Sequence, residues 1–267
     1  MSRYVHGYSE REAERLGDQS SILRHLLHDG TRYAPGARVL EAGCGVGAQT
    51  EVLAANSPLT RFTSIDISED SLAKAGARIA AGGISNVEFR EADVFALPFE
   101  KESFDHVFVC FLLEHLDRPL RALDELKKVL RPGGTITVIE GDHGSCFWYP
   151  ETTESKLVWN CLIQVQKQLG HDPLIGRRVY PLLHTAGFHV RRCDPKWVYG
   201  DALNPSLLDG MVNRIIVPMV ETARQKSLEL KIVDEATWKK GIADLEKSGI
   251  PPGGTFFYTW FKALGVK

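Results

Sequence analysis

A glycine-rich turn after a short apolar segment is the strongest constraint in this chain. The segment reads Val39-Leu40-Glu41-Ala42-Gly43-Cys44-Gly45-Val46-Gly47, and residues 48–55 after it have a helical pattern. Glycines at such a turn allow positive φ angles and let a ligand approach the main chain closely. In a doubly wound sheet, the turn between the first strand and its helix is where a nucleotide-like ligand binds. The sequence therefore predicts an α/β fold with a ligand site at this turn.

Strand-like and helical segments alternate along the rest of the chain. We expect helices at 48–55, 69–81, 120–130, 153–168 and 176–186, and strands at 38–42, 62–67, 87–90, 106–111, 135–140, 188–193 and 255–262. Alternation of this kind indicates right-handed βαβ units and a parallel sheet with helices on both faces. A chain of 267 residues with 43% hydrophobic residues is large enough to bury such a core without disulfides or a metal.

The spacing of the glycines separates two classes of ligand. A dinucleotide site uses G-x-G-x-x-G, whereas this turn has G-x-G-x-G with Glu41 two residues before Gly43. A carboxylate at that position favours a ligand with an ammonium and a sulfonium, and it would repel a pyrophosphate. Asp66 follows Gly47 by 19 residues at the end of the second strand, where it can accept hydrogen bonds from both ribose hydroxyls.

With these features the chain resembles the class I S-adenosylmethionine-dependent methyltransferases. Ser64–Ser68 resembles the second motif of that family, Glu91–Val94 the third, Phe104–Val107 with Cys110–His115 the fourth strand and its loop, and Leu130–Gly134 the turn before the fifth strand. The resemblance is strongest to methyltransferases of the ubiquinone/menaquinone-biosynthesis type and to those that modify natural products. It implies a Rossmann-like, doubly wound, seven-stranded sheet whose last strand is antiparallel.

The resemblance also implies the cofactor S-adenosylmethionine, the product S-adenosylhomocysteine and a set of cofactor-binding residues. These residues are Tyr8, Glu41, Gly43, Cys44, Gly45, Gly47, Asp66, Ile67, Asp93, Val94, Cys110 and Phe111.

Three parts of the chain are expected to have different roles. We expect an N-terminal helical lid at 1–35, a cofactor-binding core at 36–194 and 255–267, and a helical cap inserted between the last two strands at 195–254. The segment with Tyr4, His6 and Tyr8 resembles the region that folds over the cofactor in the family. The alternative for this segment is a frayed terminus.

Methyl transfer from a sulfonium needs an aligned acceptor and a site without water, and it needs a general base only if the acceptor must lose a proton. The loops after the fourth and fifth strands offer His115, His143 and Glu140 as candidate catalytic residues. The alternatives are that His115 caps the following helix and that His143 is a solvated loop residue. Large aromatic residues after Cys146 favour the wall of a small-molecule pocket or, alternatively, the core of the cap.

Composition and motifs limit the acceptor and the location. The net charge is −2, and neither an Asn/Asp-Pro-Pro-aromatic motif nor a Pro-Cys dipeptide is present, so we expect no nucleic-acid substrate. The five scattered cysteines indicate neither a disulfide framework nor a zinc site, and we expect no metal. Without a signal-like N-terminus or a long apolar run, we expect a cytoplasmic protein that does not insert into a membrane.

The prediction is therefore methyl transfer to a small, aromatic or amphipathic acceptor. A protein acceptor, a nicotinamide-dependent oxidoreductase and a non-catalytic binding module are the alternatives. The methylated atom and the oligomeric state are left open.

Overall fold

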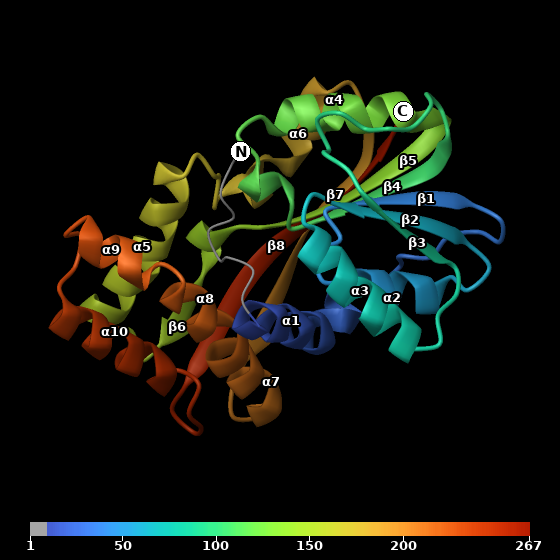
Figure 1. Ribbon diagram of the computed structural model, residues 1–267. Coiled ribbons are helices and arrows are strands. Elements are labelled where there is room, and N and C mark those ends of the chain that lie inside the picture. Colours follow the sequence, from blue (N-terminus) through green and yellow to red (C-terminus); the bar gives the residue numbers. More distant parts are fainter. Residues whose placement is uncertain (1–9) are drawn as a thin grey trace. The chain divides into compact units, whose positions relative to one another are not determined.

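The computed structural model describes residues 10–267, and a mixed sheet runs through it (Figure 1). The strands follow the order β3-β2-β1-β4-β5-β8-β6, and β7 pairs with β8. Strands β1 to β5 pair with one another in parallel, whereas β8 is antiparallel to both β5 and β6. The strands are β1 (Arg38–Ala42), β2 (Arg61–Asp66), β3 (Val87–Glu91), β4 (Phe104–Cys110), β5 (Leu130–Gly141), β6 (Phe147–Tyr149), β7 (His189–Gly200) and β8 (Thr255–Val266). The α/β fold class and the antiparallel last strand are confirmed.

The sheet differs from the sequence prediction at several strands. Strand β7 ends at Gly200 rather than at residue 193, so it includes the first residues of the expected cap, and β8 ends at Val266 rather than at residue 262. Strand β6 was not predicted, because three residues are too few to show an alternating pattern, and it raises the number of strands to eight. Strand β5 begins at Leu130 rather than at residue 135, because Leu130 pairs with Phe104 before the register shifts between Phe104 and His106.

The chain divides into two compact units. The first, here called the sheet unit, consists of residues 25–141, 175–196 and 260–267, and the second, here called the helical unit, consists of 142–174, 197–259 and the described residues before 25. The lid and cap roles that the sequence suggests for 1–35 and 195–254 stay predictions.

Helices cover both faces of the parallel strands in the sheet unit. Helices α2 (Ala48–Asn56) and α3 (Glu69–Ala81) lie on one face, and α4 (Pro119–Val129) and α6 (Val179–Thr185) lie on the other (Figure 1). The middle of β4 is fully buried, as a strand covered on both faces must be. The apolar face of helix α4, which includes Leu123 and Leu126, packs into the hydrophobic core that also contains residues of β4. This packing places the carboxyl ends of the parallel strands along one edge.

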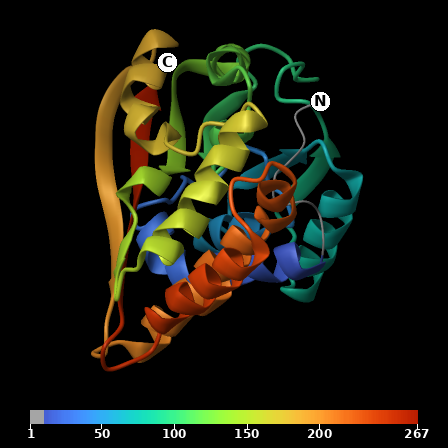
Figure 2. The same ribbon diagram turned by 90° about the vertical axis from the view of Figure 1, so that its left-hand side faces the viewer.

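Helices α5 (Thr153–Gln168) and α10 (Glu235–Lys247) lie side by side in the helical unit (Figure 2). Between β7 and β8 the chain also forms α7 (Pro205–Asp209), a π-helical turn (Gly210–Ile216), α8 (Val217–Glu221) and α9 (Arg224–Glu229). Helix α1 (Glu10–His28) begins in this unit and ends in the sheet unit. Across residues 10–267, none of the helices is both long and apolar enough to cross a membrane.

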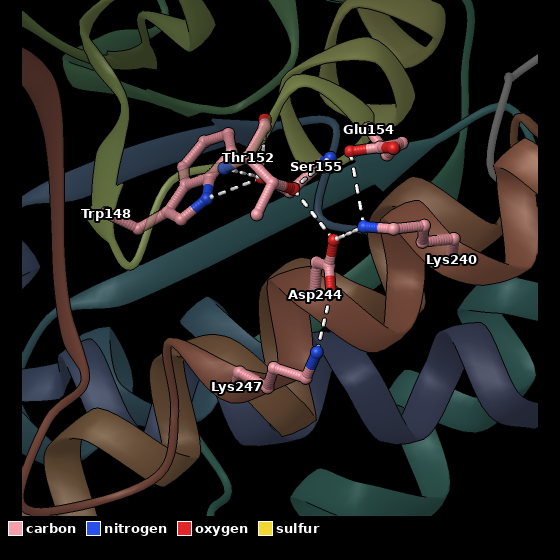
Figure 3. A network of polar contacts seen from close by, with 7 residues as sticks. All are labelled: Trp148, Thr152, Glu154, Ser155, Lys240, Asp244 and Lys247. Atoms are coloured by element: carbon pink, nitrogen blue, oxygen red, sulfur yellow. Dashed lines mark hydrogen bonds and ion pairs between the residues drawn. The ribbon is translucent and has the colours of Figure 1, made fainter.

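A polar network joins α5 to α10 (Figure 3). Thr152 caps α5 by accepting from the Ser155 N–H at 3.1 Å, and its hydroxyl donates to Asp244 at 2.9 Å. The Asp244 carboxylate is buried and also accepts hydrogen bonds from the Lys240 and Lys247 ammonium groups. Asp244 therefore links the N-cap of α5 to two turns of α10.

We expect Asp244→Ala to lower the free energy of unfolding by about 2 kcal/mol, because it removes charged hydrogen bonds at a buried carboxylate. The matched control is Lys247→Ala, which removes one largely exposed partner and should cost less than about 1 kcal/mol. The lysine hydrogen bonds hold the pKa of Asp244 below its usual value. The stabilisation that the ionised carboxylate gives to the folded protein is therefore present above about pH 4 and is lost as the pH falls further. Urea unfolding of both variants at neutral and acidic pH measures this, and equal stabilities of the two variants would contradict it.

Candidate functional site

The glycine turn lies between β1 and α2, at the carboxyl edge of the sheet. Gly43, Gly45 and Gly47 all have positive φ angles, of 73°, 51° and 75°. The N–H groups of Gly43 and Cys44 both donate to the carbonyl of Ile65, at 2.8 and 2.9 Å. The turn is therefore held against the end of β2 by its own backbone.

The three glycines fall into two groups by what surrounds them. A Cβ on Gly43 would lie 2.8 Å from Leu112 Cδ1, and a Cβ on Gly47 would lie 2.8 Å from Ala75 Cβ. A Cβ on Gly45 would have no heavy atom within 4 Å. Gly43 and Gly47 thus allow close packing within the protein, whereas Gly45 leaves its main chain open to a ligand.

Asp66, the last residue of β2, faces the same turn. Its Oδ2 accepts from the Gly45 N–H at 2.8 Å, and its Oδ1 accepts from the Ser68 N–H at 3.0 Å. Each carboxylate oxygen has further lone-pair capacity, so Asp66 can also accept from ligand hydroxyls. Ile67 beside it is 50% exposed, which suits contact with a flat apolar ring.

Glu41 lies one strand position before the turn and is buried. Its Oε2 accepts hydrogen bonds from the Thr50 hydroxyl at 2.6 Å and the Ser64 hydroxyl at 2.7 Å. Burial raises the pKa of Glu41 to about 7, and the charge of Asp66 adds to the increase, while the two hydroxyls oppose it. The carboxyl is thus in a neutral hydrogen-bonded setting, where a nearby positive ligand would favour its ionised form.

Asp93 and Val94 follow β3. Asp93 is exposed, and its Oδ1 accepts from the Phe95 N–H at 2.8 Å. The Val94 side chain belongs to the hydrophobic core of the sheet unit. The predicted contact of Val94 with the cofactor would therefore have to be made by its main chain.

The loop after β4 is tied to β5. Phe111 has a φ of 53°, which is uncommon for a residue with a bulky side chain, and its N–H donates to the Ile139 carbonyl at 2.9 Å. Glu140 Oε1 accepts from the N–H groups of Leu112 and Leu113, at 3.0 and 2.7 Å. Sequence reasoning did not find that Glu140 organises this loop, because the two partners are separated by 28 and 27 residues along the chain.

Two of the three predicted catalytic residues belong to the sheet unit. Glu140 is fully buried, and burial, together with the nearby Glu114 carboxyl, raises its pKa well above the usual value. His115 lies in the short 3₁₀ turn after β4, and its Nε2 is 3.6 Å from Glu114 Oε1. A carboxylate beside a histidine favours the protonated form of the ring.

His143 lies in the helical unit and does not suit the role of a general base. It is buried, so the alternative of a solvated loop residue is wrong, and its Nδ1 is 2.8 Å from the Tyr258 hydroxyl. Burial lowers its pKa to about 3, and the Arg15 charge contributes. The imidazole is neutral at physiological pH and binds protons weakly.

The aromatic residues after Cys146 divide into two groups. Trp148 and Trp159 are buried next to each other, as core residues of the helical unit. Phe147, Tyr149 and Trp197 are each more than half exposed. The buried pair fits the alternative of a packed core, and the exposed residues do not line an enclosed pocket.

The sheet unit thus brings together, at the carboxyl edge of the sheet, the predicted site residues on β1, β2, β4 and β5. The predicted residues that follow β3 lie at the same edge. Tyr8, Tyr4 and His6 lie outside the described residues. Within residues 10–267, no group of three or more histidine, cysteine or acidic side chains could hold a metal ion.

The sheet unit is similar in sequence to known methyltransferases. Residues 40–138 match the family model of a methyltransferase domain. The demethylmenaquinone methyltransferase of Clavibacter sepedonicus is 39% identical over 105 residues, which is 39% of this chain and 41% of that protein. The chain spans about half the length of the curated relatives it matches, from 41% to 61% for the first three.

Solved structures share the fold at low sequence identity. A putative methyltransferase from Bacillus halodurans has a TM-score of 0.58 at 18% identity, covering 94% of this chain and 98% of that one. Phosphoethanolamine N-methyltransferase 2 of Haemonchus contortus, in complex with phosphomonomethylethanolamine and S-adenosylhomocysteine, has a TM-score of 0.59 at 16% identity, covering 97% of this chain and 58% of that one.

Proposed function

Residues 40–138 form a methyltransferase domain of the class I, S-adenosylmethionine-dependent type, and on this premise we propose that the protein methylates a small, aromatic or amphipathic molecule. The observation that carries the proposal is the open main chain at Gly45 beside the Asp66 carboxylate. A ligand with a ribose can use both, because the backbone has no side chain in the way and the carboxylate accepts hydroxyl donors.

The residues at this edge fit the cofactor by charge as well as by shape. Glu41, Gly45, Asp66 and the loop at Cys110 and Phe111 would hold it, and Asp93 would contact its base. When bound, S-adenosylmethionine supplies a methyl group that the positive sulfur already activates. The protein then has to orient the acceptor and keep water away.

A proton must be removed only from some acceptors. We assign that task to His115, with the Glu114 carboxylate orienting the ring and stabilising its protonated form. Glu140 is instead engaged with the backbone of the loop after β4, and the weak basicity of His143 argues against it as the base.

Two observations support a small acceptor. The name of the demethylmenaquinone methyltransferases, to which the chain is similar, specifies a small-molecule acceptor. The net charge of −2 gives no general attraction for nucleic acid.

The first test is calorimetric titration of the purified protein with S-adenosylmethionine and, separately, with NADH. One-to-one binding of the methyl donor without binding of NADH supports the proposal, and a preference for NADH would refute it. Release of S-adenosylhomocysteine is then measured with panels of small molecules and of proteins. Turnover with proteins alone would move the proposal to a protein methyltransferase, and donor binding without any turnover would indicate a non-catalytic module.

For an acceptor that must lose a proton, His115→Ala is expected to lower kcat by about 100-fold with little change in the affinity for the donor. The matched control is His189→Ala, on the exposed amino end of β7, which should leave kcat unchanged. The rate of S-adenosylhomocysteine formation across the pH range measures the effect. An unchanged kcat in the His115 variant would remove that residue from the mechanism.

A further inference from the structure

A row of stacked aromatic rings crosses three strands in the helical unit. Phe147 on β6 pairs directly with Phe257 on β8, and Trp197 lies on β7, which also pairs with β8. The ring centroids of Phe147 and Phe257 are 4.4 Å apart, and those of Trp197 and Phe257 are 6.4 Å apart. Both pairs are stacked, so Phe257 joins the other two rings into one continuous row.

Two tyrosines extend this row on the same side of the strands. Tyr149 and Tyr199 follow Phe147 and Trp197 by two residues, and side chains two residues apart in a strand point to the same face. Phe257 is partly exposed and the other four residues are exposed. These five residues, Phe147, Tyr149, Trp197, Tyr199 and Phe257, are here called the aromatic face.

The residues that alternate with the aromatic face point to the protein interior. Trp148, Val198 and Phe256 are buried, and the Trp148 indole N–H donates to the Ser155 hydroxyl at 3.1 Å (Figure 3). An antiparallel sheet with one face packed and the other in water usually has polar residues on the water side. Aromatic residues occupy that side here, and exposed apolar patches of this kind mark surfaces that bind a partner.

The size of the aromatic face suits the centre of a protein interface. Tyr149 is 64% exposed, Trp197 60%, Phe147 53% and Tyr199 44%. With roughly 200 Å² for each aromatic side chain, these fractions leave on the order of 400 Å² of aromatic surface in water. A stable interface buries about 800 Å² on each partner and has an aromatic-rich centre within a polar rim. The aromatic face can therefore supply the whole centre of such an interface.

The charges that flank the aromatic face favour a protein partner over a lipid surface. The acids Glu151 and Asp201 follow β6 and β7 closely, and an anionic membrane would repel them. The nearby lysines are paired with acids, Lys156 with Glu151 at 3.0 Å and Lys196 with Asp29 at 3.9 Å. The flanking residues thus lack the cluster of unpaired basic groups that attracts anionic lipid.

We propose that the aromatic face is a dimer interface, covered by the same face of a second copy of this chain about a two-fold axis. A two-fold contact places one patch against itself, so the patch must be compatible with its own copy. None of the five residues is acidic or basic, so two copies of the face meet without repulsion between like charges. Rings on the two copies can then stack with an offset or edge to face, as aromatic pairs prefer.

The test is sedimentation velocity of the full chain over about 1–100 μM, a range in which a dimer of micromolar affinity dissociates and forms. The interface variants are Trp197→Lys and Phe147→Lys, which place a charge at two separate points of the aromatic face. The matched control is Leu203→Lys, which places the same charge at a 94% exposed apolar residue outside the face. Circular dichroism and thermal unfolding check that each variant is folded. Flotation with vesicles of phosphatidylcholine and phosphatidylserine tests lipid as the alternative occupant.

We expect the wild type and Leu203→Lys to form dimers with the same dissociation constant. Each interface variant should raise that constant by at least about 100-fold, because aromatic residues dominate such contacts and each substitution occurs twice in a two-fold dimer. A wild type that is monomeric over the whole range would overturn the inference, as would an unchanged dissociation constant in either interface variant. A monomeric wild type that floats with the vesicles would assign the face to lipid instead.

Discussion

Replacing Gly47 by alanine is expected to lower the free energy of unfolding by about 3 kcal/mol. The residue has a φ of 75°, where a Cβ costs about 1–2 kcal/mol. The new Cβ would also lie 2.8 Å from Ala75 Cβ and 3.0 Å from the Ala75 Cα, so that α3 would have to move away from the turn. Forcing an extra carbon into a packed contact costs about 1–3 kcal/mol more. Urea unfolding followed by circular dichroism measures the loss.

Gly45→Ala is the matched control for this variant. It also places a Cβ at a positive φ, of 51°, but the carbon would have no protein atom within 4 Å. We therefore expect a loss of about 1 kcal/mol in stability together with cofactor affinity at least about tenfold weaker. If the two variants lost equal stability, or if Gly45→Ala bound the donor like the wild type, the different roles assigned to these glycines would be wrong.

Asp66→Ala is expected to weaken binding of S-adenosylmethionine by about 100-fold. The substitution removes a carboxylate that could accept from ribose hydroxyls, and hydrogen bonds to a charged group contribute about 1.5–3 kcal/mol each. It also removes the acceptor for the Gly45 and Ser68 N–H groups, so the glycine turn loses a connection to β2. Calorimetric titration of the variant with the methyl donor measures the loss.

Two further variants, a conservative one at Asp66 and one at a neighbouring acid, separate an effect on donor binding from an effect on folding. Asp66→Asn keeps one acceptor oxygen and should lose only about tenfold in affinity. Asp70→Ala removes an exposed acid from the first turn of α3 and should bind the donor like the wild type. Donor affinity that is the same in Asp66→Ala as in the wild type would show that this carboxylate does not hold the ribose.

The glycine variants and the aspartate variants separate two roles of a motif residue, in the stability of the fold and in the binding of the ligand. Gly47 is needed because α3 packs directly against the turn, and its loss appears as instability. On the proposed function, the ligand uses the space beside Gly45 and the oxygens of Asp66, so the loss of either is expected to appear as weak binding in a folded protein. Measuring stability and donor affinity on the same samples distinguishes these outcomes.

Much of the fold could be predicted because it depends on local patterns. The bounds expected for β1, α3 and α5 agree with the structure, since the apolar runs and their caps are contiguous in the sequence. Strand β6 was missed because its pairing with β8 depends on residues more than a hundred positions away. A three-residue strand has little pattern of its own.

The sequence by itself determined the glycine turn, the acidic residues Glu41 before it and Asp66 after it, and the order of strands and helices. These features depend on the residue type at each position, because only glycine enters positive φ freely and because apolar periodicity follows the local element. Only the tertiary structure decided which glycine is open to a ligand, that His143 is buried and weakly basic, and that Glu140 binds the loop after β4. Those facts depend on strand order, register and burial. These bring together side chains whose separation along the sequence follows no recognisable pattern.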